Sequence, residues 1–258
     1  MKWWAYVLIF ILSQLAGGVA GIVLVLLFPQ GEQSMMIAAA LGVANVLAIV
    51  LTLLTHPGFR AATSRAAAYG IISLLMAPPI IFLVNWIQEL LPELPSFVDD
   101  WTLEGLIRNP LGIFVIAVLA PIAEELMFRA GVLGCLLKSA VAREEAVATT
   151  DSRLWRAVLW SALVFSVAHM NPVQMPAAFI LGILLGWAYW KSGSLVVPCV
   201  IHILNNSLAV GLTLLADNPD VTLTQFIGSD VGVAVAVGVS AVWLGLCVWR
   251  VNTSLNKV

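Results

Sequence analysis

The chain has 258 residues, of which 61% are hydrophobic and only 10% are charged. Soluble domains carry about a quarter charged residues, so this composition excludes an ordinary water-soluble domain. The net charge is −2, and no run of Lys and Arg is present that could neutralise a phosphate backbone, which argues against a nucleic-acid partner. The sequence instead predicts an all-α, polytopic transmembrane helical bundle that forms a single membrane domain over residues 1–258.

Apolar stretches long enough to cross a bilayer follow one another along the chain. A spanning helix needs about 20 apolar residues, and charged or Pro/Gly-rich breaks separate about eight candidates. The fifth and sixth are short and divided only by Met170-Asn171-Pro172, which fits either a tight hairpin or a re-entrant pair. A short amphipathic helix over Phe97–Leu106 is expected to lie along the interface. The predicted spans are 5–28, 34–55, 66–91, 110–137, 154–170, 173–190, 194–215 and 230–250.

The charges between these spans indicate an orientation. Cytoplasmic loops collect Lys and Arg, and an N-terminus placed inside leaves only Arg108 among the basic residues of the outer segments. An even number of spans then places both termini in the cytoplasm, and a bacterial inner membrane is the simplest location. The inner segments hold Lys2, Arg60, Arg65, Lys138, Arg143, Arg153, Arg156, Lys191, Arg250 and Lys257.

Two pairs of small residues are spaced for close helix packing in lipid. Gly17 with Gly21, and Gly182 with Gly186, each place two glycines four residues apart on one helix face. We expect a packing role for both pairs.

Three charged residues lie inside the fourth predicted span, where burial of an ionisable group costs about 2.5–3.5 kcal/mol. Glu125 and Arg129 are four residues apart and can form an ion pair on one helix face. Glu124 is rotated by about 100° and lacks that intrahelical partner. Because a buried carboxyl without a cation nearby gains affinity for a proton, Glu124 is the candidate general base, with Glu125 and Arg129 in support. The alternative is a salt-bridged cluster that only locks helices together.

Two of the three histidines also fall within predicted spans. His169 ends the fifth span, four residues after Phe165, so that the two rings share a face. His202 lies in the middle of the seventh span, and Asn206 follows one turn later. A single histidine in a membrane helix is usually an interhelical hydrogen-bonding residue, but polar groups from three helices together predict a site in the bundle core. His56, beside Pro57 and Gly58, is expected to be a solvated loop residue.

The sequence lacks the residues that several protease mechanisms require. The sequence has no His-Glu-x-x-His zinc motif, no aspartate inside a predicted span except Asp230 at the start of the last one, and no Gly-x-Ser-Gly segment. Water activated by side chains remains, and it needs a base, a positioning group and donors for the oxyanion. Glu124 and His169 suit the first two needs, and His202 and Asn206 suit the third.

The three motifs in chain order resemble those of the CPBP family, the type II CAAX-prenyl endopeptidases and their bacterial relatives. They are Glu124-Glu125-x-x-x-Arg129, Phe165-x-x-x-His169 and His202-x-x-x-Asn206, and the likeness runs from about Pro121 to Leu208. A difference follows Arg129, where relatives often have Gly and this chain has Ala130 and then Gly131. We interpret that difference as a variation in packing. The family-like catalytic core is expected at about residues 110–215.

This resemblance implies an intramembrane endopeptidase of the CPBP type. In that reading Glu124 and His169 activate water, His202 and Asn206 hold the oxyanion, and Glu125, Arg129 and Phe165 support them. Two histidines and a glutamate are also a ligand set that Zn²⁺ accepts, so a glutamic and a metal-dependent mechanism both stay open. The metal-free one is favoured, with no cofactor required, because an asparagine one turn from His202 suits an oxyanion pocket.

The expected partner is a membrane-associated protein or peptide in the lipid bilayer, and a prenyl group is not implied. A non-catalytic membrane protein of the same fold, acting in bacteriocin self-immunity or as a scaffold, is the main alternative. A proton-coupled transporter is a weaker one, since broken helices arranged as repeats are not seen in the sequence.

Overall fold

Helices make up all the regular structure in the described part of the chain. The computed structural model describes residues 1–29, 31–56, 64–91, 94–96, 100–142, 151–216 and 222–255. Each predicted span overlaps a helix of this structure. The long helices outside the fourth span are α1 (Trp3–Leu27), α2 (Gln33–Thr55), α3 (Ser64–Glu89), α8 (Asp151–Ala168), α9 (Met175–Ser192), α10 (Val196–Ala216) and α12 (Asp230–Leu255).

The fourth predicted span is one continuous helical rod, which we call the central helix. It comprises α5 (Pro110–Phe114), η1 (Val115–Leu119), α6 (Ala120–Glu124), η2 (Glu125–Leu133) and α7 (Gly134–Ala142), where η1 and η2 are π-helical. Two short helices, α4 (Asp100–Arg108) and α11 (Leu223–Ile227), lie in connections. The α4 helix overlaps the predicted interfacial helix, whose residues 97–99 lie outside the described residues.

Five described helices are long and apolar enough to cross a membrane: Trp3–Leu27, Gln33–Thr55, Pro110–Ala140, Val196–Ala216 and Asp230–Val251. The chain is therefore an integral membrane helical bundle, as predicted. Helices α3, α8 and α9 account for the remaining predicted spans. They are helical, but they do not meet this standard of length and hydropathy. At 18 residues, α8 and α9 are each about 27 Å long, which is short for the hydrocarbon core.

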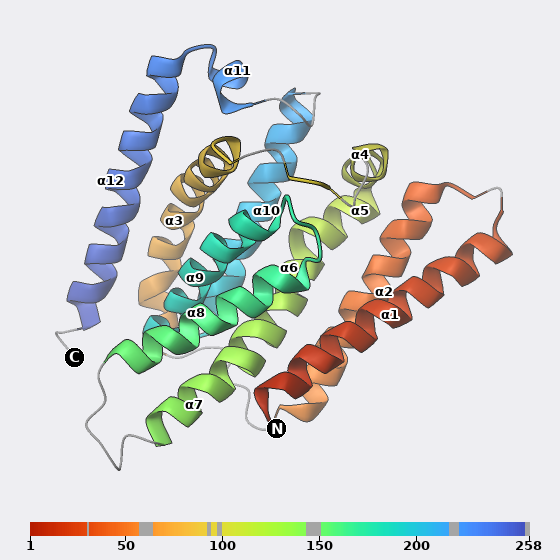
Figure 1. Ribbon diagram of the computed structural model, residues 1–258, viewed down its shortest axis with the longest axis horizontal. Coiled ribbons are helices and arrows are strands. Elements are labelled where there is room, and N and C mark those ends of the chain that lie inside the picture. Colours follow the sequence, from red (N-terminus) through yellow and green to blue (C-terminus); the bar gives the residue numbers. More distant parts are fainter. Residues whose placement is uncertain are drawn as a thin grey trace.

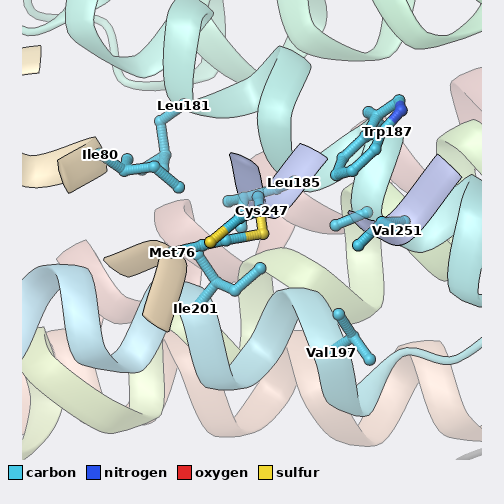
Figure 2. Packing of buried hydrophobic residues seen from close by; sticks show 10 residues of the cluster. Met76, Ile80, Leu181, Leu185, Trp187, Val197, Ile201, Cys247 and Val251 are labelled. Atoms are coloured by element: carbon cyan, nitrogen blue, oxygen red, sulfur yellow. The ribbon is translucent and has the colours of Figure 1, made fainter. Parts of the chain in front are cut away.

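The central helix runs between two groups of helices (Figure 1). The α1–α2 hairpin packs on one side, while α8, α9, α10, α3 and α12 lie on the other, and both chain ends lie at the same end of the bundle. Figure 2 shows the core of the second group, where Met76 of α3, Leu185 of α9, Ile201 of α10 and Cys247 of α12 meet.

Close packing at the predicted glycine pairs is confirmed. A Cβ at Gly17 would lie 2.6 Å from the Cβ of Ala44 on α2, and one at Gly182 would lie 3.1 Å from the Cα of Ala162 on α8. The glycines thus allow backbones to approach where lipid supplies no hydrophobic driving force.

Candidate active site

The central helix changes its hydrogen-bond register just before the predicted base. Pro121 has no N–H, so a regular helix through it loses a bond. In the preceding π-helical turn the Ala120 N–H donates to the Val115 carbonyl, five residues back. The same register would pair the Ile116 carbonyl with Pro121, which cannot donate.

Asn206 supplies the missing donor from α10. Its Nδ2 donates to the Ile116 carbonyl at 3.0 Å, and the Nδ2 of Asn205 donates to its Oδ1 at 3.2 Å. These two bonds fix which end of the Asn206 amide is the donor. One hydrogen of the Nδ2 remains for another acceptor, because an amide nitrogen carries two.

The predicted ion pair is confirmed and has a third member. Arg129 Nε lies 3.0 Å from Glu125 Oε2, and both side chains are fully buried. His202 Nδ1 lies 2.9 Å from the other oxygen of Glu125. An ionised carboxylate only accepts, so Nδ1 carries the proton, and Glu125 orients the imidazole.

Glu124 takes a different position, as predicted from its rotation around the helix. Its side chain retains 19% exposure, and its Oε2 lies 3.8 Å from His202 Nε2. His202 therefore stands between the two neighbouring carboxylates, with one ring nitrogen toward each. The expected lack of a partner for Glu124 holds within its own helix but not across to α10.

Phe165 packs at the centre of these groups. The Arg129 guanidinium carbon lies 4.5 Å from its ring centroid, a cation–π distance. The rings of His169 and His202 meet it edge to face, with centroids 4.8 and 5.9 Å away. The predicted placement of Phe165 and His169 on one face is confirmed, and the ring of Phe165 also contacts the arginine that holds Glu125.

His169 lies in the turn after α8 and not within the helix, which corrects the prediction that a span contains it. Its Nδ1 is 2.9 Å from the Phe165 carbonyl, which can only accept, so this nitrogen donates. The chain then turns through Met170, whose φ of 51° is unusual for a residue other than glycine. Ser166 secures the turn by donating to the Met175 carbonyl at 2.6 Å.

All four predicted catalytic side chains line one cavity of about 370 Å³. His169 reaches this cavity from the turn after α8, while Glu124 comes from the central helix and His202 and Asn206 from α10. The wall also contains amide side chains that the sequence analysis did not single out, namely Asn85, Gln88, Gln174 and Asn205. An amide side chain within an apolar stretch is the feature of the sequence that could have identified each of them.

His56 differs from its prediction as a solvated residue. It is half-buried at the end of α2, with its ring centroid 6.2 Å from that of Tyr6. Burial lowers the pKa of His56, and the positive charge of Lys138 lowers it further. It does not line the cavity that holds the other two histidines.

The metal-dependent alternative concerns the His and Glu side chains of this cavity. Among the residues that the structure describes, no three His, Cys, Asp or Glu side chains are arranged to hold a metal ion. His202 and His169 direct their Nδ1 atoms to Glu125 and to a carbonyl, which leaves only the Nε2 atoms for other partners.

Comparison with known proteins finds similarity over the same segment of the chain. Residues 107–208 match the family model described as Rce1-like, type II CAAX prenyl endopeptidase. Over 113 residues the chain is 32% identical to the membrane-embedded CAAX protease MroQ of Staphylococcus aureus (strain USA300), a match that covers 44% of this chain and 42% of that protein. No solved structure matches. The resemblance inferred from the three motifs is confirmed over these residues.

Proposed function

We propose, from the premise that residues 107–208 carry the core of a CPBP-family membrane protease, that this chain is an intramembrane endopeptidase. Its reaction would be hydrolysis of a peptide bond in a membrane-associated protein or peptide. The observation that carries the proposal is the single cavity lined by Glu124, His169, His202 and Asn206. A bundle core that gathers polar groups from several helices is how such sites are built.

Glu124 and His169 would prepare the water. The Nδ1 of His169 donates to a carbonyl, so the Nε2 of the neutral ring has a lone pair that can accept from water and orient it. Glu124 would take the proton as the water oxygen bonds to the carbonyl carbon. The same proton would then pass to the amide nitrogen as the C–N bond breaks.

His202 and Asn206 would stabilise the oxyanion. Asn206 keeps one Nδ2 hydrogen beyond its bond to Ile116. Since Glu125 fixes the first proton of His202 on Nδ1, donation from Nε2 requires a second proton and a cationic ring. Glu125, 2.9 Å away, is the carboxylate that would stabilise that cation, because Glu124 carries the water proton at this step.

The amide-lined wall suits an unwound substrate segment. Inside a membrane, backbone N–H and C=O groups that leave a helix need new partners. Asn85, Gln88 and Gln174 each offer both a donor and an acceptor along the cavity. We infer a substrate that enters as a locally extended peptide, with no requirement for a prenyl group.

The cellular setting proposed from sequence is a bacterial inner membrane with both termini in the cytoplasm. Topology can be tested independently of catalysis by labelling single cysteines placed at Lys2 and at Glu104. The expected result is that an impermeant reagent added outside intact cells reaches only the second. Labelling only at the first would reverse the orientation.

The decisive experiment compares purified wild type with Glu124→Gln, Glu124→Ala and His169→Ala in liposomes containing a peptide library. Cleavage should fall to background in all three variants, while size-exclusion profiles and helix content stay unchanged. Glu32→Gln is the matched control, because Glu32 is an exposed carboxylate at the start of α2. Full cleavage by a folded Glu124→Gln variant would refute the proposal.

Two outcomes separate the alternatives. A non-catalytic protein of this fold would show no cleavage by wild type and equal biological effect in all variants. Chelator treatment of the active wild type tests zinc dependence, and activity should persist if side chains alone activate the water.

A further inference from the structure

A second cavity, which we call the arginine cavity, lies away from the candidate active site. Its volume is about 610 Å³, and it lies between the beginning of α1, the end of the central helix and the beginning of α8. These elements meet at the end of the bundle where both chain termini lie (Figure 1). It is lined by Trp3, Leu136, Ser139, Ala140, Arg153, Arg156, Ala157 and Trp160.

Two arginines provide the charge of this cavity. Arg153 and Arg156 are three residues apart on α8, so their side chains share a face of the helix. Within the described part of the chain neither has an ion-pair partner, in contrast to Arg108 with Glu104 and Arg129 with Glu125. Among the residues that the structure describes, two neighbouring guanidinium groups therefore supply the charge that faces this cavity.

The remaining wall is apolar and aromatic. Leu136, Ala140 and Ala157 supply aliphatic surface, and the rings of Trp3 and Trp160 are 41% and 60% exposed. The Ser139 hydroxyl is already used as a donor to the Cys135 carbonyl at 2.9 Å. A ligand that fits must therefore combine an anionic group with apolar chains.

The side chains around the arginine cavity are of the kinds that gather at a membrane surface. Near the arginine cavity, Trp155 meets Trp190 edge to face at 5.7 Å, and Lys191 lies 4.2 Å from the ring centroid of Trp190. Tryptophan gathers at the boundary between hydrocarbon and headgroups, and lysine and arginine there attract anionic lipids. A phosphate held by α8 would lie at the depth of a headgroup.

We propose that the arginine cavity binds the headgroup of an anionic phospholipid, with its phosphate on Arg153 and Arg156 and its apolar portion along Trp3 and Trp160. Guanidinium groups suit phosphate because their N–H donors match its oxygens in pairs. The bound lipid would join the start of α8 to α1 and to the end of the central helix. This site does not depend on the proposed peptidase activity.

The test uses the full chain, purified in a neutral detergent, with thermal unfolding followed by tryptophan fluorescence. Phosphatidylglycerol should raise the unfolding temperature, whereas phosphatidylcholine and inorganic phosphate should not. In Arg153→Gln/Arg156→Gln, affinity for phosphatidylglycerol measured by native mass spectrometry should fall on the order of tenfold or more. Arg250→Gln, on α12 at the same end of the bundle, is the matched control and should bind like wild type.

A charge-preserving variant makes the result independent of folding defects. Arg153→Lys/Arg156→Lys should retain part of the affinity, because lysine keeps the charge but loses the paired donors. Equal binding of phosphatidylglycerol by wild type and the glutamine variant would overturn the proposal. Equal stabilisation by phosphatidylcholine or by inorganic phosphate would also overturn it.

Discussion

Arginine side chains in two regions of this molecule have opposite environments. Arg129 in the central helix is fully buried, paired with Glu125 at 3.0 Å and stacked on Phe165. Arg153 and Arg156 line an open cavity at the end of the bundle. The first region is neutralised by the protein itself, so its charge serves to position other side chains. In the second region we propose that the guanidinium groups bind a lipid from outside the chain.

The two environments also differ in how much stability is lost when an arginine is removed. A buried ion pair contributes little net stability, but removal of one partner leaves an uncompensated charge in a medium that solvates it poorly. An arginine at the surface stays hydrated whether or not it has a charged partner. The two regions should therefore respond very differently to the same substitution.

The largest effect is expected from Arg129→Met, which leaves the buried Glu125 carboxylate without its guanidinium partner. The free energy of unfolding should fall by about 3–5 kcal/mol. Arg156→Met should change it by no more than about 0.5 kcal/mol in lipid-free detergent. Denaturant titration in mixed micelles measures both variants. Equal stabilities would show that the burial of Arg129 carries no such cost.

A double substitution sharpens this first comparison. In Glu125→Leu/Arg129→Leu both charges disappear, so much of the lost stability should return. Cleavage should remain low, because His202 loses the carboxylate that fixes its Nδ1 proton. Recovery of both stability and activity would remove Glu125 from the mechanism.

Asn206→Ala should give the next largest effect. Loss of one oxyanion donor lowers kcat by about 10²–10³-fold. Loss of the bond to the Ile116 carbonyl should cost a further 1 kcal/mol or so of stability, about the value of one hydrogen bond. Steady-state kinetics with a cleaved peptide and thermal unfolding measure the two parts.

Pro121→Ala separates these two parts of the Asn206 effect. Alanine restores an N–H that the Ile116 carbonyl can accept from, so Pro121→Ala/Asn206→Ala should regain stability relative to Asn206→Ala. Its kcat should stay low. A rise of kcat together with stability would mean that Asn206 acts only as a structural partner of the central helix.

Sequence patterns predicted the helices, the Glu125–Arg129 pair and the Phe165–His169 contact, because each depends on residues a few positions apart along the chain. They did not predict the π-helical turns, although Pro121 was visible in the sequence. The contact of His202 with Glu125 joins residues 77 positions apart, and it depends on how α10 packs against the central helix. The placement of His169 within a span was wrong because α8 ends at Ala168, before the turn through Met170.

A third and smaller effect is expected on stability, from the packing of the central helix against α1 between the two regions. Gly131 follows Arg129 on the central helix, and a Cβ there would lie 2.6 Å from the ring of Tyr6 on α1. Gly131→Ala should destabilise the protein by about 1–3 kcal/mol through overpacking. Gly18→Ala is the control, because a Cβ at Gly18 meets nothing within 4 Å. Unfolding temperatures that fall equally would contradict a specific clash at Tyr6.

The smallest effect is expected at the amide-lined wall, where Gln88→Ala removes one candidate partner of the substrate backbone. One hydrogen bond contributes about 0.5–1.5 kcal/mol, so KM should rise roughly 2- to 10-fold. The value of kcat should change little, because Gln88 contacts none of the reacting groups in the proposed reaction. Gln14→Ala is the matched control, since Gln14 lines a separate groove between α1 and α2. A fall in kcat at constant KM would instead place Gln88 among the groups that act in the transition state, and the division between a buried catalytic cluster and a substrate-binding wall would need to be redrawn.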